Sequence, residues 1–287
     1  MTRLVAPRLA TAPAPSAPLS EAAQREAIRF EGVTKAFSNR PAVRGIDLKI
    51  AAGSFTVVVG PSGCGKSTLL NMIAGLSEPN EGYVFVRGRL VDGPTEDTAL
   101  LFQSYNLFPW LTAVDNVAFG LETGGMKRRD ARAEARRLLA NVGLADYADR
   151  VPAALSGGMR QRVALVRAFA RRPQILLMDE PFAALDYQTR KMMQAYLLAT
   201  WENTGATVVM VTHDLDEALF LADQLVLISG SPGSVAEVID MDLPRPRDKA
   251  DPELAALYQR LEAHMEAEAA RGEFSPEELA AIEKYRG

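Results

Sequence analysis

The stretch FTVVVGPSGCGKSTLLNMIAGL, residues 55–76, contains an apolar run, a glycine-rich loop and a helical pattern in direct succession. The loop matches G-x-x-x-x-G-K-[ST] in the strand–loop–helix context that this pattern requires. Its glycines let backbone N–H groups surround phosphate oxygens, its lysine can reach the β- and γ-phosphates, and its serine hydroxyl can ligate magnesium. We therefore predict a nucleotide-binding loop rather than a simple glycine-rich turn, made of Gly60, Pro61, Ser62, Gly63, Cys64, Gly65, Lys66, Ser67 and Thr68. Cys64 occupies a free position of the pattern and receives no catalytic role.

The composition is that of a globular chain with one large or two modest domains. The 287 residues are 48% hydrophobic and 24% charged. A net charge of -4 gives no electrostatic footprint for nucleic-acid binding over the whole chain. Cys64 is the single cysteine, which excludes an intrachain disulfide and favours a reducing setting. No run approaches the roughly 18 apolar residues of a membrane span, so a membrane role would need a partner.

Other β-rich runs surround the loop and alternate with helical stretches. They are ALLFQ, QILLMDE, ATVVMVTH and QLVLIS, and they predict an α/β domain with a largely parallel sheet over residues 28–239. Strand signals vanish between residues 106 and 155, where the segment 127–144 reads as a polar-faced helix ending at Gly143. We expect a helical insertion there. Residues 1–27 form an extension rich in alanine and proline, whose composition predicts disorder.

A second motif, ILLMDEP at residues 175–181, places two carboxylates at the end of an apolar run. Open parallel sheets bind ligands at the carboxyl ends of their strands. Asp179 suits a magnesium shell, and Glu180 suits activation or orientation of an attacking water. By itself such an acidic pair is also compatible with a solvated strand edge or a helix cap.

The stretch LSGGMRQRVALVRAFARRP, residues 155–173, reads as a helix that begins on Ser156 and two glycines. Serine is an ordinary N-cap, whereas each early glycine costs about 1 kcal/mol of helix propensity against alanine. A helix start has unpaired N–H donors and about half a positive charge. The glycines therefore indicate either a flexible helix entry or a backbone surface presented to an anion.

Together these motifs resemble those of the ATP-binding cassette ATPases. LSGGMRQR is similar to the signature motif of that family, Gln103 in LLFQSYN to the Q-loop, Asp186 in PFAALD to the D-loop, and His213 in VTHD to the switch histidine. The resemblance covers residues 28–239. It implies an α/β P-loop NTPase with a RecA-like core, an antiparallel β portion, an inserted α-helical subdomain at about residues 106–172, and C-terminal helices.

The resemblance also implies the cofactors and the roles of the site residues. ATP and Mg²⁺ are the expected ligands. The catalytic residues would be Glu180, His213 and Gln103, and the magnesium ligands would be Ser67, Gln103 and Asp179. Residues that complete the ATP site of a second copy in a head-to-tail dimer would be Ser156, Gly157, Gly158 and Asp186.

Two positions depart from the family pattern. Met159 stands where the signature usually has glutamine, which removes an amide but leaves the glycine N–H groups. Phe37 stands where the family usually stacks a tyrosine on adenine. Phenylalanine still offers an apolar face for a base, although Phe37 also suits a core position.

The stretch LFQSYNLFPWLTAVDNVAFGLE, residues 101–122, resembles the ATPase subunits of bacterial importers for nitrate, sulfonates and taurine. This implies a homodimer bound through permease subunits to the cytoplasmic face of the inner membrane. An outside solute-binding protein would supply a small anion, with bicarbonate equally allowed. Phe108, Pro109, Trp110 and Leu111 would dock a permease helix or fill the core of the helical insertion; the sequence favours neither.

Two other function classes compete with a transport ATPase. A soluble cassette ATPase acting on nucleic acid or ribosomes would typically show two cassettes, long coiled coils or a basic stripe, and we see none of these. A non-catalytic switch would use ATP only to dimerise. Intact Glu180 and His213 argue against such a switch.

The tail, residues 240–287, predicts two amphipathic helices. The first has apolar residues at helical spacing, namely Leu254, Leu257, Tyr258, Leu261 and Met265. The second begins with a capping box on Ser275. We expect the helices to pack on the domain rather than to bridge subunits, and we interpret His264 as a surface position without a role.

Overall fold

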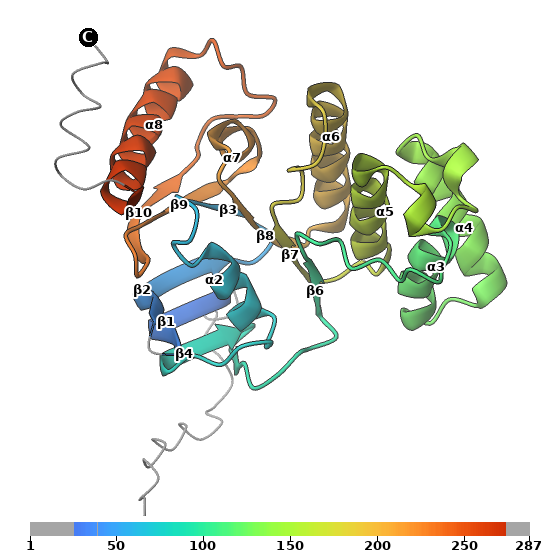
Figure 1. Ribbon diagram of the computed structural model, residues 1–287, viewed down its shortest axis with the longest axis horizontal. Coiled ribbons are helices and arrows are strands. Elements are labelled where there is room, and N and C mark those ends of the chain that lie inside the picture. The colour runs from blue at the N-terminus through green and yellow to red at the C-terminus, as the bar shows by residue number, and fades with distance from the viewer. Residues whose placement is uncertain (1–25, 39, 274–287) are drawn as a thin grey trace, which may run out of the picture.

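The computed structural model describes residues 26–38 and 40–273, and its elements form two sheets and a helical region (Figure 1). The alanine- and proline-rich extension, apart from Glu26 and Ala27, and the helix expected from Ser275 lie outside these residues. Strand β1 (Glu26–Phe37) begins two residues before the expected domain start at Ile28.

The central sheet has six strands in the order β10-β9-β3-β8-β7-β6. The strands are β3 (Phe55–Val59), β6 (Thr98–Leu101), β7 (Ile175–Asp179), β8 (Thr207–Thr212), β9 (Gln224–Ser229) and β10 (Ser234–Asp240). All neighbouring pairs are parallel except β9 and β10. Every residue of β3 and β8 is buried, as continuous apolar runs in a parallel sheet require. The predicted α/β fold with a largely parallel sheet is confirmed.

A second, antiparallel sheet has the order β2-β1-β4-β5. Its strands besides β1 are β2 (Arg40–Ala51), β4 (Glu81–Val86) and β5 (Arg89–Leu90). Helix α2 (Lys66–Ile73) packs between the two sheets, and its Leu69, Leu70 and Met72 share a hydrophobic cluster with Phe30 of β1 (Figure 1). This sheet is the antiparallel portion implied by the family resemblance.

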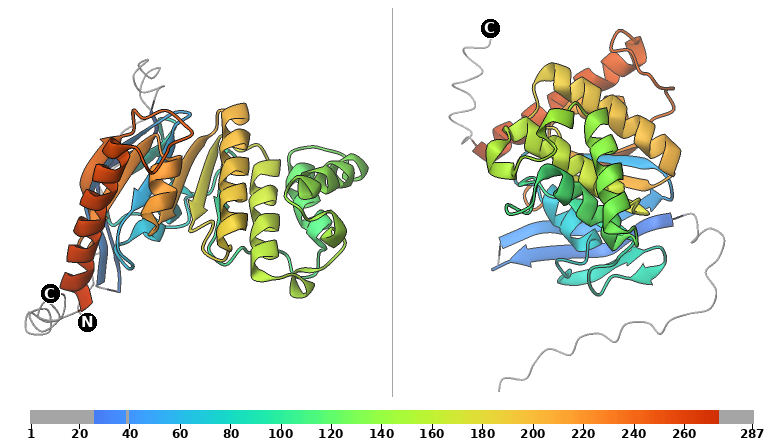
Figure 2. Two further views of the ribbon diagram at one scale, coloured as in Figure 1. Left: turned by 90° about the horizontal axis from the view of Figure 1, so that it is seen from above. Right: turned by 90° about the vertical axis from the view of Figure 1, so that its right-hand side faces the viewer.

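The region between β6 and β7 is helical. It contains α3 (Ala113–Thr123), α4 (Arg128–Asn141), two short 3₁₀ turns (Ala145–Tyr147 and Pro152–Ala154) and α5 (Gly157–Ala170). Helix α4 buries Ala131, Ala135 and Leu139, which are spaced four residues apart and form one narrow apolar stripe. This otherwise polar helix packs against its neighbours through that stripe. Gly143 follows at φ +71°, at the predicted helix end. Helix α5 stands between α6 (Tyr187–Thr204) and helices α3 and α4 in Figures 1 and 2.

Helix α7 (Leu215–Leu221) and helix α8 (Pro252–Glu273) complete the described chain. Leu254 and Leu261 of α8 are buried, and Leu257, Tyr258 and Met265 pack partly buried against the main core. This confirms packing of the first tail helix on the domain. His264 is not the surface bystander that the sequence suggested: it is half-buried, and its Nε2 lies 2.7 Å from Oγ of Ser229.

The structure contains no membrane-spanning helix within the part of the chain that it describes, because none of those helices is both long and apolar enough.

Candidate functional site

The glycine-rich loop connects β3 to α2, and its shape depends on glycine. Gly63 and Gly65 have φ angles of +80° and +93°, which L side chains rarely adopt. Gly60 approaches β9 so closely that a Cβ on it would lie 2.4 Å from the carbonyl oxygen of Ile228. A larger residue would clash at Gly60 and Gly65, whereas at Gly63 the space is open and the cost would be the positive φ alone.

Helix α2 begins directly at the end of this loop. Its N-cap is Gly65, which offers no side-chain hydrogen bond to the first turn, so that turn remains available to an anion. Lys66 is buried, and its Nζ donates to the carbonyls of Gly60 and Pro61 at 2.7 and 2.8 Å. A positive charge and a helix N-terminus therefore meet at one loop, which is the arrangement that phosphate binding needs.

Cys64 is buried within the same loop. Burial raises the pKa of its thiol, although the nearby Lys66 charge opposes the shift. The thiol is neutral at pH 7, and a neutral thiol is a poor nucleophile. This agrees with the absence of a catalytic role for Cys64.

Ser67 and Asp179 meet although they lie 112 residues apart, because β7 ends beside the start of α2. Ser67 Oγ donates to Asp179 Oδ1 at 3.1 Å. Burial raises the pKa of the Asp179 carboxyl, and the hydrogen bond from Ser67 opposes that rise. A hydroxyl and a carboxylate are oxygen ligands of the kind that Mg²⁺ uses together with substrate phosphates. The donor set fits Mg²⁺, and the described residues contain no cluster of three or more His, Cys, Asp or Glu that would hold a metal unaided.

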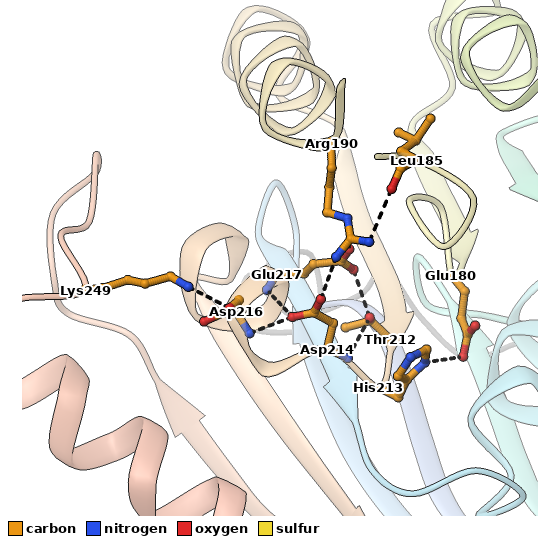
Figure 3. Close-up of polar contacts among 9 residues, drawn as sticks. All are labelled: Glu180, Leu185, Arg190, Thr212, His213, Asp214, Asp216, Glu217 and Lys249. Atoms are coloured by element: carbon orange, nitrogen blue, oxygen red, sulfur yellow. Dashed lines mark hydrogen bonds and ion pairs between the residues drawn. The ribbon is translucent and has the colours of Figure 1, made fainter. Parts of the chain in front are cut away.

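The next residue, Glu180, is held from two sides. Gln103 Nε2 donates to Glu180 Oε2 at 3.3 Å, and His213 Nδ1 lies 2.9 Å from Glu180 Oε1 (Figure 3 shows the histidine contact). Gln103 follows β6, Glu180 follows β7 and His213 follows β8, which are adjacent strands of the parallel sheet. The backbone of Glu180 has φ +46°, an uncommon value for a non-glycine residue. A fixed carboxylate beside a half-exposed histidine can take up a proton from water.

A polar network that the sequence analysis missed involves Thr212 and Asp214, the residues on either side of His213 (Figure 3). Glu217 is only 4% exposed and accepts a hydrogen bond from Thr212 Oγ1 at 2.9 Å. Arg190 of α6 pairs with Asp214 at 2.9 Å and donates to the Leu185 carbonyl at 3.4 Å. The only sign of this network in the sequence is the segment HDLDEA, residues 213–218, where Asp214 precedes a helical pattern as an N-cap residue does. In the structure Asp214 is the N-cap of α7.

Burial raises the pKa of Glu217 from 4.5 to about 7. The hydrogen bond from Thr212 opposes the shift, whereas the negative charge of Asp214 adds to it. Arg190 does not remove the effect, because its Nε lies 3.7 Å from Glu217 Oε1 and has no hydrogen-bond partner among the described residues.

Ser156 is the N-cap of α5, and its Oγ accepts a hydrogen bond from the Met159 N–H at 3.2 Å. The following glycines contact the segment between β7 and α6: a Cβ on Gly158 would lie 3.3 Å from Leu185 Cδ2. Asp186 caps α6 by accepting from the N–H groups of Gln188 and Thr189. In the described chain, none of the hydrogen bonds of Ser156 or Asp186 reaches residues 60–68.

The two departures from the family pattern have different surroundings. Met159 is partly buried against the main core. Phe37 is 51% exposed at the end of β1, with Lys35 Nζ 5.1 Å from its ring centroid. The core interpretation of Phe37 is wrong, because half of its surface is open to solvent.

Trp110 is 73% exposed, which excludes the interpretation that it fills the core of the helical region. Its ring lies beside Phe108, at 5.6 Å between centroids, and Phe108 in turn contacts Phe119 at 4.9 Å. Asn116 is fully buried and bonds to both the N–H and the carbonyl of Phe108, so the loop is fixed from inside. A groove of about 450 Å³ adjoins it, lined in part by Leu76, Leu101, Phe108, Phe119 and Arg167.

Comparison with known proteins agrees with this geometry. Residues 43–183 match the family described as ABC transporter. The chain is 46% identical to the taurine import ATP-binding protein TauB of Pseudomonas aeruginosa, over 77% of this chain and 88% of that protein. It is also 46% identical to an uncharacterized ABC transporter ATP-binding protein of Methanocaldococcus jannaschii, over 82% and 89%.

Solved structures resemble the chain as well. One is the dimeric structure of an ATP-binding cassette in a post-hydrolysis state, bound to ADP and Pi. The similarity has a TM-score of 0.68 and 33% identity, and it covers 76% of this chain and 100% of that one.

Proposed function

The chain belongs to the ABC transporter family as an ATP-hydrolysing, ATP-binding subunit, and we propose that it powers an importer for a small anion such as taurine, another sulfonate, nitrate or bicarbonate. Relatives named as taurine import subunits support the importer assignment, because they are 42–46% identical over 88–95% of their own length. The loop that holds Phe108 and Trp110 supports it from the sequence.

In this proposal, residues 60–68 bind the phosphates of ATP, Lys66 neutralises the β- and γ-phosphates, and Phe37 stacks on the adenine. Ser67, Gln103 and Asp179 would hold Mg²⁺, which supplies positive charge to the phosphate oxygens during transfer. The observation that carries the assignment is the placement of Glu180 between Gln103 and His213 beside the Ser67–Asp179 pair. Glu180 orients the attacking water and takes its proton, while His213 fixes the carboxylate.

We further propose that two copies assemble head to tail. The start of α5 at Ser156, Gly157 and Gly158 would face the γ-phosphate held by the other copy, with Asp186 beside it. The lack of a hydrogen bond from Ser156 or Asp186 to residues 60–68 within the described chain supports a site shared between copies, and so do the dimeric cassettes that the chain resembles. Residues 28–239 would form the ATPase domain, with residues 106–172 as its helical subdomain.

The exposed Trp110 and the adjoining groove are the proposed contact for a permease subunit. Large aromatic residues in a fixed loop are typical anchors of protein interfaces. Through the permease the chain would sit at the cytoplasmic face of the membrane, and a solute-binding protein on the other side would deliver the anion.

Isolation of the tagged chain from its native membranes, followed by mass spectrometry of what copurifies, tests this function. We expect permease subunits, and the reconstituted complex should take up labelled taurine, nitrate or bicarbonate only when ATP is inside. Lys66→Ala should copurify with the same subunits but drive no uptake. Copurification with ribosomes or nucleic acid instead would favour the soluble alternative and contradict the importer.

A further inference from the structure

We propose that helix α8 positions the phosphate-binding loop, acting through the hairpin turn Gly230–Gly233 between β9 and β10. The inference rests on the proposed role of residues 60–68 in binding phosphate. It gives the tail helix a part in nucleotide affinity that neither the motifs nor the fold assigns to it.

The hairpin turn packs directly against the phosphate-binding loop. A Cβ on Gly233 would lie 1.9 Å from the carbonyl oxygen of Cys64, so only a hydrogen atom fits there. Gly233 is also fixed by its backbone: its N–H donates to the Ala42 carbonyl, and its carbonyl accepts from the Arg44 N–H, both at 2.9 Å. The Gly233 backbone therefore packs against the Cys64 carbonyl without room for a side chain, and a shift of Gly233 toward the loop must displace Cys64.

Two further glycines of the loop contact the same part of the fold. Gly65 faces Val43 of β2, where a Cβ would lie 2.4 Å from Val43 Cγ1. Gly60 faces the carbonyl of Ile228 near the end of β9. The next residue of that strand, Ser229, is the one that contacts His264 of α8. The loop therefore rests on β2, the end of β9 and the hairpin turn, and its shape follows theirs.

Helix α8 contacts the start of this turn and the preceding residue of β9 with two side chains. Glu268 Oε2 accepts a hydrogen bond from the Gly230 N–H at 2.7 Å, and His264 Nε2 lies 2.7 Å from Ser229 Oγ. The two side chains are four residues apart and lie on one face of the helix. Figure 1 shows α8 beside β9 and β10, with the turn between those strands reaching toward β2. Buried Leu254 and Leu261 anchor α8 to the core, which makes it a rigid support.

These contacts hold the N–H groups of the phosphate-binding loop in place before nucleotide binds. The N–H groups of the loop bind phosphate best when they already point inward, and any ordering required on binding lowers the affinity. Loss of the Glu268 hydrogen bond releases Gly230, whose φ of +82° marks a tight turn, and the turn then loosens its hold on Cys64. Nucleotide affinity should fall while the remote core stays intact.

The test compares three variants of the full chain by titration calorimetry with ADP and Mg²⁺. Glu268→Ala should weaken ADP binding by roughly threefold to tenfold; about tenfold is the ceiling, reached if the whole free energy of one charge-assisted hydrogen bond stabilises the binding-competent loop. Glu268→Gln keeps an oxygen that can accept from Gly230, and we expect affinity within roughly twofold of the original. The matched control is Arg260→Ala, which breaks the 2.7 Å pair with Glu237 on β10 but does not touch the hairpin turn.

Amide hydrogen exchange separates a local effect on the loop from a general loss of stability, because general destabilisation would speed exchange in the central strands as well. Backbone amides of Gly60 and of residues 62–65 should exchange faster in Glu268→Ala, with unchanged exchange in β7 and β8. Ser229→Ala removes the contact with His264 while leaving the sequence of α8 unaltered. We expect it to speed amide exchange in the same part of the loop.

Three outcomes would overturn the inference: ADP affinity of Glu268→Ala within roughly twofold of the original, an equal loss in Arg260→Ala, or an equal loss in Glu268→Gln. Failure of the proposed phosphate-binding role of residues 60–68 would look different, since the unaltered chain would then bind no ADP. Failure of the importer assignment alone would leave ADP binding and this comparison of variants unchanged.

Discussion

His213 Nδ1 lies 2.9 Å from Glu180 Oε1, although the two residues are 33 positions apart in the chain. The contact exists because β7 and β8 are parallel neighbours, and both side chains leave the sheet at the same edge. Gln103 comes to the other carboxylate oxygen from β6. The Glu180 carboxylate is thereby held by residues that follow β6 and β8, the strands on either side of β7.

Glu180→Gln should keep ATP binding and lower hydrolysis by roughly 10²- to 10⁴-fold, the usual contribution of a general base. Glutamine has the same size but cannot take the proton from water. The variant should accumulate as an ATP-bound dimer, measured by phosphate release together with size-exclusion chromatography. Glu202→Gln, an exposed position on α6, is the control and should hydrolyse ATP normally. Near-normal release from Glu180→Gln would remove this residue from the central role.

Gly158→Asp should block closure of the ATP dimer, because it adds a negative charge where the γ-phosphate of the partner is proposed to bind. Binding of ATP by the single subunit should survive. A Cβ at this position already lies 3.3 Å from Leu185 Cδ2, so steric and charge effects must be separated. Gly158→Asn has nearly the same volume without charge and should retain more dimerisation and hydrolysis than the aspartate variant. Equal behaviour of the two variants would contradict the charge argument.

Trp110→Ala should change the melting temperature of the isolated subunit very little, since surface substitutions usually stay within about 0.5 kcal/mol. A buried tryptophan would instead cost roughly 3–5 kcal/mol. Permease association and uptake should weaken, measured by pull-down and by transport in vesicles. Tyr147→Ala, an exposed aromatic residue outside the Phe108–Phe119 cluster, serves as the control. Undiminished permease binding by the Trp110 variant would count against the docking surface.

Glu217→Gln should remove a pH dependence of stability. The pKa of Glu217 is raised from 4.5 to about 7, so the folded chain keeps a proton that the unfolded chain loses. The contribution of Glu217 to the free energy of unfolding is therefore full below about pH 4.5 and declines as the pH rises to about 7. The decline is at most roughly 3 kcal/mol, at 1.36 kcal/mol per pKa unit.

Urea unfolding of both proteins at pH 5 and pH 8 measures the effect. The glutamine variant should lose less stability between the two values than the original chain, because glutamine does not titrate and its oxygen can still accept from Thr212. Parallel pH profiles for the two proteins would show that Glu217 titrates near its ordinary value.

The sequence alone determined what depends on neighbours along the chain. The stretch at residues 55–76 specifies a strand, a phosphate loop and a helix because its alternation of apolar run, glycines and helical spacing is local. The Ser156 cap and the helix end before Gly143 follow from the same short-range hydrogen-bonding rules.

The tertiary structure decided everything that depends on how distant segments pack. Strand order brings Ser67 to Asp179 and His213 to Glu180, and no local pattern encodes that order. Trp110 has the same apolar ring whether it is exposed or buried, so its 73% exposure emerges only when Asn116 fixes the loop from inside. In the sequence His264 reads as a surface residue of an amphipathic helix; only the packing of α8 beside β9 places Ser229 Oγ 2.7 Å from its Nε2. In each case the deciding contact joins residues far apart in sequence, and their separation is set by packing of the whole domain rather than by the residues themselves.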